Sequence, residues 1–235
     1  MKVEITGRPS DLQIRVLFKG QSTLPLRQLH DGPAGITRIG IKTGSFDPFH
    51  PGHVILALQT ILDGVNDQVI FLPNGDNPHG KQLSPFAVRY QAVQQAAGLF
   101  GQFLSCADFK ERNTNSEVVR RVRQQFGEGV EINWIASSTG QSSRRILEKL
   151  SAGIPFDQAL AEVVGPVDRY LYYYYLADQA ADVLSQNPSP SLLVRQFPAR
   201  YYPFSRVHSS DIRSGRLQCS FVPIEEGVLM SVLGE

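Results

Sequence analysis

Short apolar runs alternate with longer amphipathic segments through most of the chain. The runs have the length and the composition of buried strands, and the segments between them repeat their apolar positions with a helical period. Strands are predicted at 37–43, 67–73, 102–106, 130–136 and 191–196. Helices are predicted at 53–63, 84–98 and 115–126. This alternation predicts an α/β fold, a Rossmann-like parallel sheet with helices on both faces.

The boundary of the helix expected at 84–98 has a local signal. Ser84 followed by Pro85 is typical of an N-cap residue and a proline at the first helical position. We therefore expect Ser84 to cap this helix.

The pattern also predicts how the chain is divided. Residues 1–36 hold too few apolar side chains to bury a core of their own, so we expect an N-terminal extension with one strand, packed on the core. The core domain would then occupy 37–235, with 141–187 as a divergent insertion of helical and aromatic character. Within it, the aromatic segment 170–175 is prone to form a strand. Core packing or a subunit contact is the favoured role of these rings over the stacking of bases.

Composition limits the class of protein. The chain has 235 residues, of which 42% are hydrophobic and 19% charged, an ordinary balance for a globular domain. A net charge of +1 argues against a nucleic-acid partner, and no run approaches the ~20 apolar residues that a membrane span requires. Cys106 and Cys219 lack the spacing of a metal site, and the first residues lack the apolar centre of a signal peptide. We expect a cytoplasmic protein, with a homo-oligomer left open.

The segment 44–53, GSFDPFHPGH, connects the first predicted core strand to the first predicted helix. The N–H groups and the dipole at a helix N-terminus attract anions. The imidazoles of His50 and His53 add donors that can follow charge into a transition state. Ligands of parallel sheets bind at the carboxyl ends of the strands, where this segment lies. The pattern therefore predicts a phosphate-binding loop.

This segment resembles the HxGH signature of the nucleotidyltransferase superfamily, G-[ST]-F-D-P-x-H-x-G-H. It looks most like that of the nicotinate or nicotinamide mononucleotide adenylyltransferases. The resemblance implies that His50 and His53 are catalytic and that other positions of the loop bind nucleotide, namely Gly44, Ser45, Phe46 and Gly52. It also implies small-molecule substrates, ATP and a mononucleotide, with Mg²⁺ accompanying ATP and no metal site built from protein side chains.

Two further segments match the same family in part. Residues 208–215, HSSDIRSG, resemble its carboxy-terminal I-S-S-T-x-I-R signature, which implies phosphate contacts from Ser209, Ser210 and Arg213. Taken alone, this segment is equally typical of an ordinary helix start. The segment 73–81 resembles the family's N-P-H-K segment with one extra glycine, which implies nucleotide contacts from Lys81 and from Arg89 on the next helix. The alternatives are a solvated loop lysine and a helix-surface charge.

One departure bears on the function. After the strand at 130–136 the family usually carries a G-x-D segment, whereas this chain has ASSTG at 136–140. The resemblance implies an adenylyltransferase that joins ATP to nicotinate or nicotinamide mononucleotide, forming the dinucleotide and pyrophosphate. The alternatives are a sister enzyme of phosphopantetheine or cytidylyl transfer, or a nucleotide-binding protein without activity.

Overall fold

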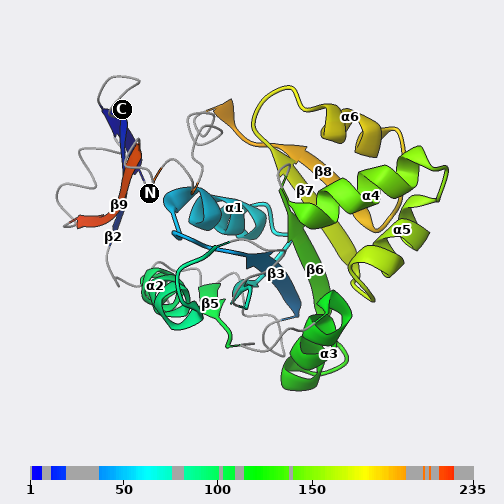
Figure 1. The fold of residues 1–235 in the computed structure, drawn as a ribbon, viewed down its shortest axis with the longest axis horizontal. Helices are drawn as coiled ribbons and strands as arrows, with labels where there is room; N and C mark the ends of the chain where they lie inside the picture. The colour runs from blue at the N-terminus through cyan, green and yellow to red at the C-terminus, as the bar shows by residue number, and fades with distance from the viewer. Residues whose placement is uncertain are drawn as a thin grey trace.

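The computed structural model describes residues 37–75, 82–100, 103–108, 114–137 and 140–199, with Ser209, Ile212 and the backbone of three further strands. Strands and helices alternate through this part of the chain (Figure 1). The elements are β3 (Arg38–Gly44), α1 (Pro51–Leu62), β4 (Gln68–Pro73), α2 (Phe86–Gly98), β5 (Leu104–Cys106), α3 (Asn115–Phe126), β6 (Glu131–Ala136), α4 (Gln141–Ser151), α5 (Phe156–Val163), β7 (Arg169–Tyr174), α6 (Gln179–Ser185) and β8 (Leu192–Gln196). Among the described residues, no helix is long and apolar enough to cross a membrane.

These strands form one six-stranded sheet in the order β5-β4-β3-β6-β7-β8, with every neighbouring pair parallel. The chain runs outward from β3 through β4 to β5, and then returns to the other side of β3 to form β6. The strand order therefore reverses between β3 and β6. In open sheets of this kind, ligands bind in the crevice at the carboxyl ends of the two strands that flank the reversal.

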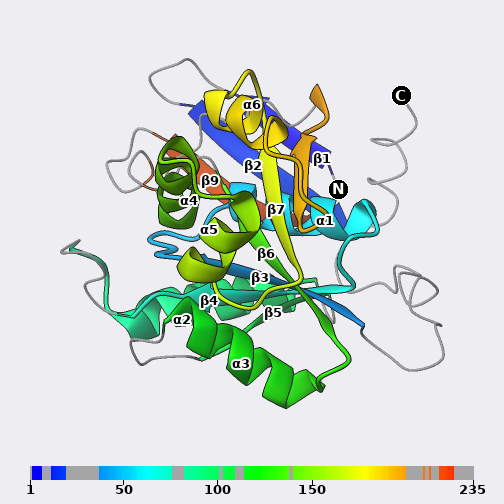
Figure 2. The same ribbon diagram turned by 90° about the vertical axis from the view of Figure 1, so that its right-hand side faces the viewer.

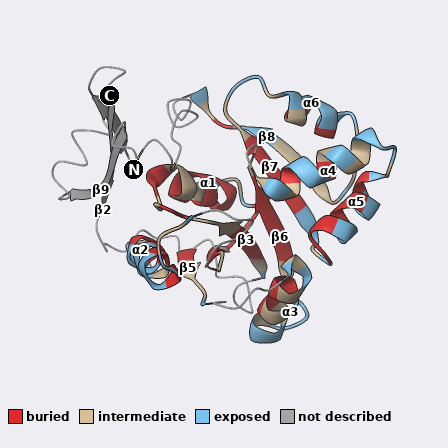
Figure 3. Cartoon of the chain, viewed as in Figure 1, coloured by how far each residue is buried: buried red, intermediate tan, exposed pale blue. Residues whose placement is uncertain are grey.

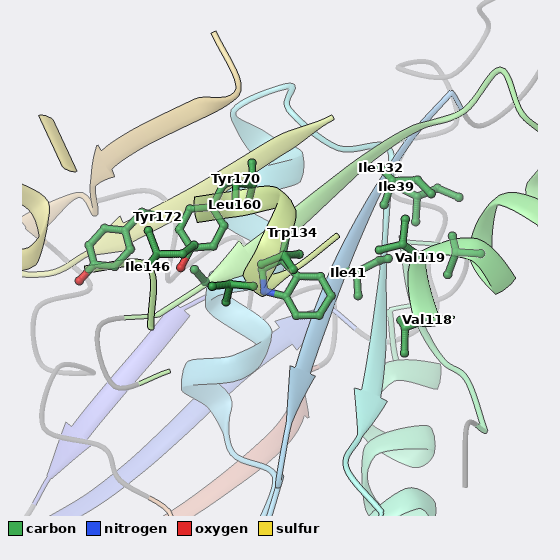
Figure 4. Packing of buried hydrophobic residues seen from close by; sticks show 14 of the residues in the cluster. Ile39, Ile41, Val118, Val119, Ile132, Trp134, Ile146, Leu160, Tyr170 and Tyr172 are labelled. Carbon is green, nitrogen blue, oxygen red and sulfur yellow. The ribbon is translucent and has the colours of Figure 1, made fainter. Parts of the chain in front are cut away.

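Helices cover both faces of the sheet, as the sequence predicts (Figure 2). Side chains of α1 and α2 join one buried cluster, and side chains of α3, α4, α5 and α6 join the other. Successive residues of a strand point to opposite faces, so Phe71 enters the first cluster and Leu72 the second. Figure 3 shows the strands of this sheet mostly buried, with exposed residues on the outer sides of α2, α3, α4, α5 and α6, whereas α1 is largely buried. In Figure 4, the Trp134 ring lies among aliphatic side chains of the second cluster.

The prediction of an insertion at 141–187 is wrong. This range supplies β7, which lies inside the sheet between β6 and β8. Tyr170 and Tyr172 are fully buried in the second cluster, and Tyr173 is buried in the first. Core packing is therefore the role of these rings, because a strand covered on both faces needs large apolar side chains in each direction.

The N-terminal extension contributes two strands rather than the one expected. β1 (Lys2–Thr6) pairs antiparallel with β2 (Leu12–Lys19), and β2 pairs in parallel with β9 (Leu217–Ile224). Together they form a separate three-stranded sheet in the order β1-β2-β9. The extension thus finds its strand partner near the other end of the chain, which local patterns cannot reveal.

Asp67 fastens the amino end of β3 to the segment that leads into β4. Its carboxylate accepts hydrogen bonds from the N–H groups of Thr37 and Arg38, at 3.0 and 2.9 Å, and from the Thr37 hydroxyl at 3.0 Å. The Arg38 guanidinium donates to the other carboxylate oxygen at 2.6 Å. Burial alone would raise the pKa of Asp67, but these hydrogen bonds outweigh it and hold the pKa below the ordinary 3.8.

We expect Asp67→Asn to lower the free energy of unfolding by about 2 kcal/mol, because the amide can no longer accept from donors on both sides. Since the pKa is lower in the folded state, the stabilisation is present above about pH 4 and disappears as the pH falls through the folded-state value. Thermal unfolding from pH 7 to pH 3 should therefore show the difference between the two proteins shrinking. Asp182→Asn, at an exposed position of α6, is the matched control. A constant difference across this range would contradict the assigned role.

Candidate functional site

The HxGH segment lies at the reversal of strand order. β3 ends at Gly44, the loop crosses the carboxyl edge of the sheet, and α1 begins at Pro51 with His50 as its N-cap residue. Proline at the first helical position lacks only an N–H that the helix would leave unpaired. The first turn of α1 therefore lies at the carboxyl end of β3, beside the reversal of strand order, where the ligand is expected.

Phe46 gives this loop its shape. Its φ of 48° lies in the left-handed region, which is costly for a residue other than glycine. Its ring is 2% exposed and meets His53 edge-on, with the ring centroids 4.9 Å apart. A Cβ at Gly44 would lie 2.8 Å from this ring, so the glycine makes room for it. The burial of Phe46 compensates for the backbone strain, and its ring packs against His53. A nucleotide contact of Phe46 stays a prediction.

The two histidines stack on the first turn of α1. The rings of His50 and His53 lie 3.8 Å apart at 29°, and Phe49 stacks on the other side of His53 at 5.2 Å. A Cβ at Gly52 would lie 3.1 Å from the His50 ring, which explains the glycine between the histidines. The spacing of the signature therefore produces one rigid stack of rings at the helix N-terminus.

The His53 ring has a defined proton arrangement. Its Nδ1 accepts a hydrogen bond from the backbone N–H of His50 at 3.2 Å. Removal of the ring from water, with smaller effects of His50 and Lys42, holds the pKa of His53 well below the ordinary 6.5. A neutral ring whose Nδ1 is an acceptor carries its proton on Nε2. His53 therefore offers Nε2–H as a donor for a ligand.

The prediction that Ser84 caps α2 is wrong. The helix begins at Phe86 with Pro85 at the N-cap position, and no side chain caps it. The backbone N–H of Ser84 donates instead to the Asp47 carboxylate at 2.9 Å. Asp47 is 5% exposed, so this contact lies inside the protein and ties the HxGH loop to the start of α2.

Arg89 is a buried clamp and not a helix-surface charge. It is 2% exposed, and its guanidinium donates to backbone carbonyls on three segments. The acceptors are Ser84 at 2.7 Å, Ser45 at 2.8 Å, Asn74 at 2.8 Å and Gly75 at 3.2 Å. These bonds occupy donors that the sequence analysis assigned to a nucleotide phosphate. Arg89 thus holds the loops after β3 and β4 and the start of α2. Its direct contact with the nucleotide stays a prediction.

The second signature lies beside the first. The Ser209 hydroxyl donates to the carbonyl of Pro48 at 3.1 Å, and Ile212 packs against the same buried cluster as Phe49. The two segments that the sequence analysis pairs are therefore neighbours in space. Ser210, Arg213 and Lys81 lie outside the described residues, so their nucleotide contacts stay predictions.

Lys42 is not among the residues predicted from the sequence to form the site. Its side chain is 6% exposed on β3, and its ammonium donates to the Ile135 carbonyl on β6 at 3.4 Å. A lysine in the middle of an otherwise apolar, doubly covered strand is the signal that could have revealed it. At the carboxyl end of β6, no described residue supplies the carboxylate of the usual G-x-D segment, and Ser137 accepts from Ser143 there at 2.7 Å.

Metal binding by side chains alone has no basis in the described ranges, where no three His, Cys, Asp or Glu residues cluster. Mg²⁺ commonly binds through substrate phosphates and water with few protein ligands. A site of this composition is compatible with Mg²⁺ that arrives on a nucleotide.

Comparison with known proteins agrees with the geometry. The model of the Cytidylyltransferase-like family matches residues 41–125, which include the HxGH loop. A probable nicotinate-nucleotide adenylyltransferase of Clostridium botulinum is 39% identical over 31% of this chain and 37% of its own length. One of Clostridium perfringens is 31% identical over 43% of this chain and 52% of its own. The chain thus matches about a third to a half of the length of these relatives.

Among solved structures, the Plasmodium falciparum nicotinic acid mononucleotide adenylyltransferase complexed with NaAD has a similar fold. The TM-score is 0.52 with 14% identity, over 76% of this chain and 83% of that protein. At this identity the similarity supports the fold alone. The family model and the matching relatives therefore support a nucleotidyltransferase, and the chain is similar over part of its length to the nicotinate-nucleotide adenylyltransferases.

Proposed function

We propose that this protein transfers the adenylyl group of ATP to nicotinate mononucleotide or its amide, forming the dinucleotide and pyrophosphate. The observation that carries the proposal is the stack of His50 and His53 on the first turn of α1, at the reversal of strand order. Helix N–H groups and imidazole donors suit a polyphosphate, and Ser209 of the second signature lies beside this loop. The names of the matching relatives favour the pyridine mononucleotide as acceptor.

The chemistry requires positioning and neutralisation of charge rather than a covalent intermediate. An oxygen of the mononucleotide 5′-phosphate attacks the α-phosphorus of ATP, and the bond to the bridging oxygen breaks to release pyrophosphate. Negative charge grows on the leaving oxygens in the transition state. The Nε2–H of His53, fixed by the bond between Nδ1 and the His50 N–H, would donate to this charge. Mg²⁺ enters as the partner of ATP.

The first test is a coupled assay that follows pyrophosphate. Purified protein with ATP and Mg²⁺ should release pyrophosphate with nicotinate or nicotinamide mononucleotide, and the ratio of the two kcat/KM values identifies the preferred acceptor. Phosphopantetheine, with ATP, and CTP with a phosphocholine acceptor test the sister activities. Nucleotide binding without turnover on any acceptor would point to the inactive alternative and would overturn the proposal.

His53→Ala should lower kcat by about 100-fold or more, while the affinity for α,β-methylene-ATP changes by less than about threefold. A donor directed at developing charge stabilises the transition state far more than the ground state. The matched control is Leu62→Ala, at an exposed position near the other end of α1. Near-normal turnover of the His53 variant, with its thermal unfolding unchanged, would show that His53 has no part in the chemistry.

Arg89→Lys should lower the stability of the ligand-free protein by about 2 kcal/mol, because an ammonium cannot reach carbonyls on three segments. The kcat/KM for ATP should fall with it, since the loops beside the site loosen. Thermal unfolding without ligand, followed by kinetics, checks both effects against Arg144→Lys on the exposed side of α4. An unchanged melting temperature with a large loss of ATP affinity would instead indicate a direct phosphate contact.

A further inference from the structure

Lys42 lies on β3, two residues before the start of the HxGH segment. Residues two apart on a strand share a face, so Lys42 points to the same side of the sheet as Gly40. A Cβ at Gly40 would meet Ile135 of the first buried cluster, which α1 covers (Figure 1). The ammonium acts electrostatically on His53 and reaches the Ile135 carbonyl on β6. Lys42 therefore spans the two strands that flank the reversal of strand order, close to the N-terminus of α1.

Nothing in the described surroundings neutralises this ammonium. Among the described residues its one hydrogen bond is to the Ile135 carbonyl, and this bond is long at 3.4 Å. Burial lowers the pKa of Lys42 to about 8, and no carboxylate of the described residues contributes to the shift. At pH 7 about nine-tenths of the molecules still carry the charge. A lone buried cation is costly, and the positive end of the α1 dipole adds to the cost. A bound anion would relieve both penalties.

We infer that Lys42 is a direct contact of the nucleotide site, and that its ammonium binds a phosphoryl oxygen of a substrate at the N-terminus of α1. The inference rests on the proposed function and names a residue for it outside the HxGH and carboxy-terminal signatures. The phosphoryl oxygen can belong to ATP or to the acceptor mononucleotide, because the two phosphates meet at the reacting centre. In both cases the ammonium, the helix N–H groups and the His53 donor converge on one anion.

Calorimetric titration of Lys42→Met distinguishes the sources. One arm uses α,β-methylene-ATP with Mg²⁺ and the other uses nicotinate mononucleotide. We expect the dissociation constant of the nucleotide that contacts Lys42 to rise about tenfold or more, which is typical of a lost hydrogen bond to a charged group. Lys149→Met is the matched control, since Lys149 lies on α4 in an ion pair with Glu162. It should bind both ligands as the parent does.

Lys42→Met should change the stability of the protein and its affinity for the nucleotide in opposite directions. Replacing a lone buried cation with an isosteric apolar side chain should leave the melting temperature of the ligand-free protein equal or higher. A contact residue thus weakens binding without weakening the fold. A lower melting temperature, with both dissociation constants within twofold of the parent, would mean that Lys42 only joins β3 to β6 and would overturn the inference. A parent protein that binds neither nucleotide would instead refute the proposed function itself.

The pH dependence of the parent protein tests the inference even if Lys42→Met fails to fold. Affinity for the contacting nucleotide should fall as the pH rises from 7.5 to 9.5, approaching tenfold per unit above about pH 8 as the ammonium loses its proton. Among the described residues, the titratable groups on the α1 side are His50 and His53, and burial holds the pKa of His53 well below the ordinary 6.5. Burial raises the pKa of Tyr173, on β7, above the tested pH range. Affinity for both nucleotides that stays constant up to pH 9.5 would overturn the inference.

Discussion

The Arg89 guanidinium holds the whole candidate site in place. It draws together carbonyl oxygens from the loop after β3, the loop after β4 and the segment before α2. Loops at the carboxyl edge of a parallel sheet have few backbone partners of their own, because the ladder ends there. A buried planar cation with several donors satisfies those carbonyls at once. The HxGH loop can then carry the strained backbone of Phe46 and present His53 in one orientation.

Periodicity predicted the sheet well, since β3, β4, β6 and β8 all lie within a residue or two of the expected runs. Each of these strands is a short apolar run bounded by polar residues. Such a run is easily distinguished from the amphipathic helical segments on either side of it. The aromatic strand β7 was assigned to an insertion because its neighbours along the chain are helices and its family resemblance is weak. Only the pairing with β6 and β8 places it inside the sheet. Long-range pairing, as between β2 and β9, leaves no local signal.

The site could be predicted in part. The HxGH signature places His50 and His53 on one helical turn, and their rings stack there because residues three apart on a helix are neighbours. Their catalytic role stays a prediction. The hydrogen-bond partners of the charged side chains could not be predicted from the signature. Asp47 and Arg89 bind backbone atoms of segments distant in sequence, and these contacts depend on how the loops fold over the sheet edge. Residue type alone could not distinguish a structural cation from one that contacts the ligand.

Arg89 and Lys42 illustrate the difference between a structural cation and a cation that contacts the ligand. Both are cations buried at the carboxyl edge of the same sheet, at 2% and 6% exposure. Arg89 donates to four carbonyls, so its charge is already stabilised and an arriving phosphate would have to displace those bonds. Lys42 has one long hydrogen bond and a lowered pKa, so its charge is poorly stabilised until an anion arrives. The buried ammonium of Lys42 costs the folded protein stability. The free energy released when an anion neutralises it becomes available for binding the substrate.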